Sequence, residues 1–223
     1  MDFRREWKHE LSPRDVPVIR SRLRAVLRPD SHGSGGTYQI RSLYFDDRTD
    51  RALREKIDGV NRREKFRLRY YNGDIRLIHL ERKSKINGLC RKEAALVTAD
   101  EVRLLLGGDT AWMEGSDRGL VWELHQKMAV QMLRPKTIVD YTREAYVYAP
   151  GNVRVTLDYG IRTGLGGTDF LNPQCVTIPA RDAPVVLEVK WDEYLPDTVR
   201  SVVQLESRQA AAFSKYAVCR RYG

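Results

Sequence analysis

One segment, residues 63–71, constrains the fold of this chain more than any other. Its sequence is Arg-Glu-Lys-Phe-Arg-Leu-Arg-Tyr-Tyr, with a cation at every second position up to residue 69. Successive side chains of a β-strand point to opposite faces, so a strand would place the cations on one face: Arg63, Lys65, Arg67 and Arg69. The aromatic residues favour a strand, and a helix here would have no apolar stripe.

Cations at alternate positions of one strand repel one another. A fold keeps such a row only where water or an anion neutralises it. For this segment alone, the solvent-exposed face of an antiparallel sheet is the favoured interpretation. The alternative is an anion-binding face, and it gains support if other strands carry the same pattern.

Turn and capping signals predict the elements around this strand. The pairs Asn72-Gly73 and Asn87-Gly88 are two-residue hairpin signals, so strands over 75–84 and 89–97 should follow it in a meander. Further strands are predicted over 3–11, 37–45, 136–148, 153–161 and 184–191. Helices are predicted over 12–27, 46–57, within 98–133 and over about 196–222. About eight mostly antiparallel strands with helices between them indicate an α+β fold, which we expect to form one domain over residues 1–223.

The charge balance narrows the class of partner. The chain holds 39 Lys and Arg against 30 Asp and Glu, a formal net charge of +9. Such a surplus indicates an anionic partner, which is a nucleic acid, a membrane surface or a phosphate-rich small molecule. The three cysteines are far apart, and neither a signal peptide nor a membrane span is recognisable, so we expect a cytoplasmic protein.

A second pattern recurs on three predicted strands. The tripeptide Glu-x-Lys occurs as Glu6-Trp7-Lys8, Glu81-Arg82-Lys83 and Glu188-Val189-Lys190. The strands over 153–159 and 184–191 each have one charged and one apolar face, and helices are the available cover for the apolar faces. The charged faces then either meet solvent or, if the sheet closes on itself, point inward.

A closed sheet would collect most of these charges in its interior. The cations would be Lys8, Arg63, Lys65, Arg67, Arg69, Lys83, Lys92, Arg143, Arg154 and Lys190, and the acids Glu6, Glu81, Asp158 and Glu188. Such an interior suits a chain of phosphates, which arginine and lysine bind, with a divalent metal held by the carboxylates.

Seven motifs, in order along nearly the whole chain, resemble the VTC domain, the polyphosphate-polymerase branch of the triphosphate tunnel metalloenzymes. They are Ser42-Leu43-Tyr44-Phe45-Asp46-Asp47, Arg67-Leu68-Arg69-Tyr70-Tyr71, Glu81-Arg82-Lys83, Tyr141-Thr142-Arg143-Glu144-Ala145-Tyr146, Val153-Arg154-Val155-Thr156-Leu157-Asp158, Leu187-Glu188-Val189-Lys190 and Phe213-Ser214-Lys215-Tyr216. The resemblance implies an eight-stranded antiparallel closed β-barrel with a polar lumen and outer helices. It also implies growth of inorganic polyphosphate from ATP with Mn²⁺ or Mg²⁺.

The resemblance also implies roles for single residues. It places the metal ligand at Glu188 and phosphate-binding residues at Arg67, Arg69, Lys83, Lys92, Arg143 and Lys215. The charged strand faces add Lys8, Arg63, Lys65 and Arg154 as expected phosphate-binding residues, and Glu6, Glu81 and Asp158 as candidates to assist the metal ligand. The residues expected to act in catalysis are Lys83, Arg143, Lys190 and Lys215. Tunnel triphosphatases begin with Glu-x-Glu-x-Lys, whereas this chain has Arg4-x-Glu6-x-Lys8. One carboxylate is therefore missing, which agrees with the polymerase branch.

Two other functions stay open on the sequence. One is hydrolysis of tripolyphosphate or nucleoside triphosphates on the same fold, and the other is non-catalytic binding of polyphosphate. Nucleic acid is a weak candidate, because the aromatic side chains beside the basic row point to the opposite face. No SPX or membrane segment accompanies the motifs, so attachment to the inner face of a membrane would require a separate membrane protein.

Overall fold

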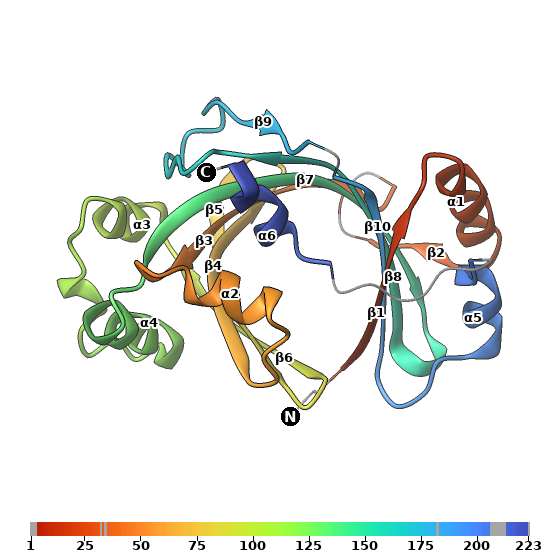
Figure 1. Ribbon diagram of the computed structural model, residues 1–223, viewed down its shortest axis with the longest axis horizontal. Helices are drawn as coiled ribbons and strands as arrows, with labels where there is room; N and C mark the ends of the chain where they lie inside the picture. The colour runs from red at the N-terminus through yellow and green to blue at the C-terminus, as the bar shows by residue number, and fades with distance from the viewer. Residues whose placement is uncertain (1–3, 32, 34, 182, 206–212, 223) are drawn as a thin grey trace. The chain divides into compact units, whose positions relative to one another are not determined.

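The computed structural model of the chain is an α+β fold, and it describes residues 4–31, 33, 35–181, 183–205 and 213–222. The strands are β1 (Arg5–Leu11), β2 (Arg28–Pro29), β3 (Thr37–Asp46), β4 (Arg63–Tyr71), β5 (Asp74–Ile86), β6 (Leu89–Val97), β7 (Arg134–Tyr148), β8 (Val153–Thr163), β9 (Ile178–Pro179) and β10 (Val185–Trp191). The α-helices are α1 (Asp15–Val26), α2 (Arg51–Ile57), α3 (Ala99–Leu106), α4 (Gly119–Val130), α5 (Asp197–Val203) and α6 (Lys215–Cys219) (Figure 1). Short 3₁₀ turns cover Ala111–Met113, Pro150–Asn152 and Arg220–Tyr222.

The strands form an open sheet. Hydrogen-bonded neighbours follow the order β1-β10-β8-β7-β3-β4-β5-β6, with β2 beside β7 and β9 beside β8. Within the described residues no pairing joins β1 to β6, the two ends of this order. The predicted closed barrel is therefore wrong, whereas the eight main strands and their α+β class are confirmed. Alternation of side chains fixes which face a strand presents, but closure depends on strand tilt and stagger, which alternation does not encode.

The chain divides into two compact units. Unit 1 contains residues 1–39, 141–161 and 181–213, and unit 2 contains residues 40–140, 162–180 and 214–223. The long strands β3, β7 and β8 contribute residues to both units. Each unit has its own buried apolar cluster.

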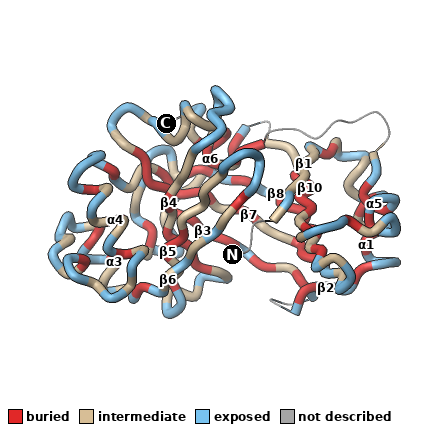
Figure 2. Tube along the Cα trace, turned by 90° about the horizontal axis from the view of Figure 1, so that it is seen from below, coloured by how far each residue is buried: buried red, intermediate tan, exposed pale blue. Residues whose placement is uncertain are grey.

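In unit 1 the apolar face of β8 and β10 packs under helices. Val155 and Leu187 are fully buried on these strands, together with Ile19 of α1 and Val199 of α5. Figure 2 shows buried stretches, in red, along β10 and α5. The helices α1 and α5 also contact each other (Figure 1). The expectation that helices cover the apolar strand faces is thus confirmed here.

In unit 2 the same principle holds around the meander β4–β5–β6. Phe66 and Leu80 lie in one buried cluster with Leu105 of α3 and Leu124 of α4. Helix α4 packs against β5 and β6, and α3 packs against β5 (Figure 1). The helices therefore occupy the apolar face of the meander, which places the cations of residues 63–69 on its other face.

Both predicted hairpins are present. Asn72 and Gly73 have φ values of 50° and 73°, and Asn87 and Gly88 have 49° and 80°. Two successive positive φ values are typical of the two-residue type I′ turn, which Asn-Gly adopts with little strain. The observed bounds of β4 and β6 coincide with the predicted strands 63–71 and 89–97, and β5 is longer than predicted at both ends.

The ends of several helices differ from the prediction more than the ends of the meander strands do. Helix α1 starts at Asp15 with Arg14 as its N-cap, because the Ser12 hydroxyl donates to the Asp15 carboxylate instead of capping a helix at Pro13. Helix α2 starts only at Arg51. The predicted helix over 196–222 corresponds to α5, α6 and the last 3₁₀ turn, with Gln204, Leu205, Phe213 and Ser214 outside a helix. Residues 206–212, including the alanines at 210–212, lie outside the described residues.

The lengths and hydropathies of the helices bear on membrane insertion. Among the described residues, no helix is long and apolar enough to cross a membrane.

Candidate functional site

The charged faces of the two units each carry a cluster of ion pairs. We name the group in unit 2 the β4–β5 cluster, which consists of Lys65, Arg67, Arg69, Glu81, Lys83 and Lys92. We name the group in unit 1 the β1–β10 cluster, which consists of Glu6, Lys8, Arg143, Asp158, Glu188 and Lys190. Together they contain most of the residues that the sequence predicted for phosphate and metal binding.

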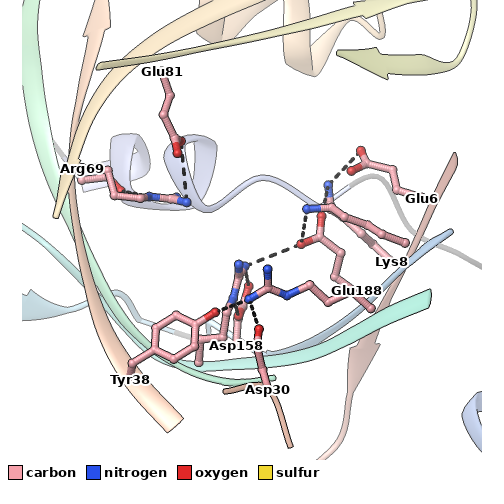
Figure 3. Close-up of polar contacts among 12 residues, drawn as sticks. Glu6, Lys8, Asp30, Tyr38, Arg69, Glu81, Asp158 and Glu188 are labelled. Atoms are coloured by element: carbon pink, nitrogen blue, oxygen red, sulfur yellow. Dashed lines mark hydrogen bonds and ion pairs between the residues drawn. The ribbon is translucent and has the colours of Figure 1, made fainter. Parts of the chain in front are cut away.

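Glu81 is the centre of the β4–β5 cluster. Its carboxylate lies 2.6 Å from Nη2 of Arg67, 3.1 Å from Nζ of Lys92 and 3.7 Å from Nη1 of Arg69. The contact with Arg69 is drawn in Figure 3. The Glu81 side chain is only 2 % exposed. Burial on its own would raise the pKa of Glu81, but Arg67, Arg69 and Lys92 hold it well below its usual range. The carboxylate therefore stays charged and neutralises part of the basic row.

Three lysines lie side by side across this sheet. Lys65 on β4 pairs directly with Lys83 on β5, and Lys83 pairs directly with Lys92 on β6. Like charges in directly opposite positions destabilise a sheet, because their side chains lie close together. This arrangement of cations across three strands is the feature of unit 2 that most favours an anionic ligand.

Two residues of β3 complete the surroundings of the arginines. The Tyr44 hydroxyl accepts a hydrogen bond of 2.8 Å from Arg67, and the Ser42 hydroxyl accepts one of 3.1 Å from Arg69. The Lys65 Nζ atom lies 5.2 Å from the centre of the Tyr44 ring. Burial would raise the pKa of Tyr44, but Arg67, Lys65 and Arg69 outweigh it and lower the pKa to about 7. The positive charges on β4 therefore stabilise the ionised form of a tyrosine on the neighbouring strand β3.

Tyr44 and Ser42 were not predicted as site residues. Both lie in the first of the seven motifs and, by strand alternation, on one face of β3. Tyr44 pairs in register with Arg67, and Ser42 with Arg69. The two residues were missed because the sequence does not indicate that β3 pairs with β4.

The β1–β10 cluster surrounds Glu188. Its carboxylate lies 3.3 Å from Nζ of Lys8, 3.3 Å from Nζ of Lys190 and 3.6 Å from Nη2 of Arg143. Lys8 also contacts Glu6 at 3.1 Å (Figure 3). These side chains share one face because Lys8 pairs with Glu188, and Glu6 with Lys190, between antiparallel β1 and β10.

Arg143 of β7 is held by two hydrogen bonds. Its Nε and Nη2 atoms donate to the two oxygens of Asp158, at 2.6 and 2.8 Å. The Asp158 side chain is fully buried. Burial would lower the pKa of Arg143, but Asp158, Tyr141 and Glu188 raise it well above its ordinary value. Arg143 is therefore a permanently charged, oriented guanidinium.

The remaining predicted residues lie at other positions. Arg154 contacts Asp30 at 2.6 Å and the Tyr38 hydroxyl at 2.7 Å (Figure 3). Asp30 directly follows the short strand β2. Arg63 donates a hydrogen bond to the backbone carbonyl of Val60, in the segment before β4. Lys215 is the first residue of α6, and Ser214 is the N-cap of that helix.

The four carboxylates predicted for the metal are divided between the two clusters. Glu81 belongs to the β4–β5 cluster, whereas Glu6, Asp158 and Glu188 belong to the β1–β10 cluster. Among the described residues, no group of three or more His, Cys, Asp and Glu side chains has the arrangement of a metal site.

A metal carried by a phosphate ligand nevertheless fits the β1–β10 cluster. Mg²⁺ is usually bound by one or two carboxylates, with substrate phosphates and water as its other ligands. Thr156 pairs with Glu188 between β8 and β10, and its Oγ1 atom is buried without a hydrogen-bond partner. An unsatisfied buried hydroxyl beside Glu188 is explained if a ligand, its metal or a water occupies this position.

Comparisons with known proteins show the family and the fold. The family model of the VTC domain matches residues 3–222. Among solved structures, the PH1012 protein of Pyrococcus horikoshii is similar at a TM-score of 0.54 and 13% identity, over 98% of this chain and 99% of that chain. A protein of Bacillus halodurans described as a candidate adenylate cyclase has a TM-score of 0.50 and 14% identity, over 92% of this chain and 95% of that chain. At such identities the likeness concerns the fold alone. A comparison with curated protein sequences found no significant match.

Proposed function

Since this chain belongs to the VTC domain family, we propose that it is a polyphosphate polymerase that transfers the γ-phosphoryl group of ATP to the end of an inorganic polyphosphate chain. The observation that carries this proposal is the row of three lysines across β4, β5 and β6, next to two arginines. An extended chain of phosphates has one negative charge at each unit and matches such a row better than a single small anion does.

Arginine and lysine residues would bind the phosphates. Arg67 and Arg69 offer planar groups of donors, which suit phosphate oxygens, and Lys65, Lys83 and Lys92 act as point charges. Glu81 neutralises this face while no ligand is bound, and the anionic ligand would take over part of that role. The residues proposed to act on the phosphoryl group during its transfer are Lys83, Arg143, Lys190 and Lys215.

The reaction needs no nucleophilic side chain. A terminal oxygen of the polyphosphate chain attacks the γ-phosphorus of ATP, the bond from that phosphorus to the β–γ bridging oxygen breaks, and ADP leaves. Oriented cations such as Arg143 would stabilise the charge that develops on the transferred group. A bound Mn²⁺ or Mg²⁺ would supply further positive charge, and Glu188 would hold it, with Glu6 and Asp158 as neighbours.

The test is a direct assay for polymer. Purified protein is incubated with ATP and Mn²⁺, and the products are separated on a polyacrylamide gel stained for polyphosphate. We expect a ladder of chain lengths in the wild type and in Glu193→Ala, which removes an exposed carboxylate just after β10. We expect no ladder in Glu188→Ala.

Two other outcomes of this assay would each indicate a different function. Release of ADP and orthophosphate without a ladder would identify a triphosphate hydrolase on the same fold. Absence of both products, with tight binding of polyphosphate, would identify a non-catalytic binding protein. A cytoplasmic location and a separate membrane partner remain predictions from the sequence.

A further inference from the structure

The basic row on β4 changes its chemical character after Arg69. Tyr71 follows on the same strand, and His79 on β5 pairs directly with Arg69. The guanidinium carbon of Arg69 lies 6.0 Å from the centre of the Tyr71 ring. The Tyr71 and His79 ring centres are 6.2 Å apart, with an angle of 75° between the planes. Two aromatic rings therefore adjoin the last arginine of the row, so the expectation that the aromatic side chains point to the opposite face is wrong for Tyr71.

Apolar side chains continue this end of the face. Leu96 on β6 pairs directly with His79, and 53 % of Leu96 is exposed. Leu77, two positions before His79 on the same face of β5, is 50 % exposed. These two side chains extend the apolar character of the two rings at this end of the face.

The opposite end of the row is entirely cationic. Lys65, Lys83 and Lys92 lie side by side, and Arg63 pairs with Lys85 beyond them. At about 3.3 Å per residue, the four steps from Lys65 to Arg69 cover about 13 Å along β4. The face thus runs from lysines, through two arginines, to two aromatic rings.

We propose that Tyr71 and His79 bind the nucleobase of the nucleoside triphosphate, so that its phosphates run along β4 from Arg69 toward Lys65. This inference rests on the proposed function and adds a base site and a direction to it. A nucleoside triphosphate has one uncharged aromatic end, whereas every unit of the polyphosphate chain is charged. The aromatic end of the face therefore suits the nucleoside, and the lysine end suits the growing chain.

The geometry of the two rings is compatible with stacking on a base. The imidazole of His79 and the phenol ring of Tyr71 each offer a flat aromatic face beside Arg69. Stacking on such rings is tolerant of base identity, so ATP and GTP analogues should bind with similar affinities.

The test compares ligands with and without a base by calorimetry, in the presence of Mg²⁺. The probes are β,γ-imido-ATP, ribose 5-triphosphate, which lacks the base, and tripolyphosphate. Stacking of one base on an aromatic residue corresponds to about 5- to 100-fold in affinity. We expect wild-type protein to bind β,γ-imido-ATP tighter than ribose 5-triphosphate by a factor in this range. This comparison needs no variant, so it stands even if a variant fails to fold.

The variants locate the base site. Tyr71→Ala and His79→Ala should weaken β,γ-imido-ATP binding by about 5- to 100-fold and change tripolyphosphate binding less than about 2-fold. Tyr71→Phe keeps the ring and should bind like the wild type. The control is Tyr194→Ala, which removes an exposed ring in the segment after β10.

Two results would overturn the inference, and they differ from each other. Equal wild-type affinity for β,γ-imido-ATP and ribose 5-triphosphate, or equal losses for both ligand types in the variants, would refute the base site and leave the proposed function intact. If wild-type protein bound neither β,γ-imido-ATP nor tripolyphosphate, both the proposed function and the base site would be refuted.

Discussion

At the scale of single residues, buried charge is the main feature of both clusters. A carboxylate as enclosed as Glu81 would be costly if it were alone, because burial penalises the charged form. Arg67, Arg69 and Lys92 compensate that penalty. The same residues would lose part of this attraction when they bind phosphate, so the stability of the protein and its affinity for ligand are linked through Glu81.

The first prediction concerns Glu81 and pH. Its folded-state pKa is depressed, so its contribution to stability is complete above the unfolded value of about 4.3 and is lost as pH falls below it. The loss should be about 1.4 kcal/mol for each pH unit below that value. We expect the advantage of wild type over Glu81→Gln in urea unfolding to shrink by about 1–2 kcal/mol between pH 6 and pH 3.

A matched control for this experiment is Glu114→Gln, because Glu114 is exposed. Its difference from wild type should not depend on pH. If the difference between wild type and Glu81→Gln were the same at pH 6 and pH 3, Glu81 would not be ion-paired as described.

The second prediction concerns Arg67. Its removal should weaken binding of tripolyphosphate by about 1–3 kcal/mol, the range of charged hydrogen bonds, as measured by calorimetry. The control is Arg76→Ala on β5, because the Arg76 side chain is 87 % exposed and paired with Asp74. Equal affinities of wild type and Arg67→Ala would refute a phosphate-binding role for this residue.

At the scale of elements, the meander was predictable and the starts of α1 and α2 were not. The Asn-Gly pairs set both hairpins, and the alternation of residues 63–71 set the faces of β4, because both signals are local. The start of α1 depends on a hydrogen bond between Ser12 and Asp15 that competes with capping. The start of α2 depends on Asp46, whose carboxylate accepts from the amides of Ala52 and Leu53. Such choices between alternative side-chain bonds are not visible in a residue pattern.

The third prediction concerns the attachment of α6. The Tyr216 hydroxyl donates to the Asp46 carboxylate at 2.8 Å, and the Tyr216 ring stacks on Tyr44 at 5.0 Å. Tyr216→Phe removes only the hydrogen bond, so we expect it to lower the free energy of unfolding by about 1.5–3 kcal/mol. Because α6 begins with Lys215, we also expect slower polymer formation.

Tyr194→Phe is the control, since Tyr194 is 58 % exposed. Urea unfolding and the rate of polymer formation are measured on both variants. Unchanged stability of Tyr216→Phe would mean that the bond to Asp46 does not hold α6 in place.

At the scale of the whole molecule, the sequence predicted which residues share a face but not how the sheet ends. Closure would require β1 and β6 to pair, and neither strand carries a local signal for or against that pairing. The four carboxylates illustrate the same limit. Strand alternation placed each of them on a charged face, but only the strand order assigns Glu81 and Glu188 to different clusters.

The fourth prediction concerns the net charge of +9. An anionic ligand relieves repulsion within the clusters and binds only the folded state, so it should raise the melting temperature. At 100 times its dissociation constant, tripolyphosphate with Mg²⁺ should add about 2.7 kcal/mol, equivalent to about 5–10 °C for a chain of this length. Sodium chloride of equal ionic strength is the control. The absence of a shift at saturating tripolyphosphate would indicate that the charged faces are merely solvated.

The most direct test of the central claim follows the γ-phosphoryl group itself. Purified protein is incubated with Mn²⁺ and ATP that carries a radiolabelled γ-phosphate, and the label in polymer and in orthophosphate is compared with the ADP formed. We predict close to one labelled phosphoryl group in polymer for each ADP, with the signal lost in Glu188→Ala and kept in Glu193→Ala. Label recovered mainly as orthophosphate would contradict the account, because the acceptor would then be water rather than a phosphate chain.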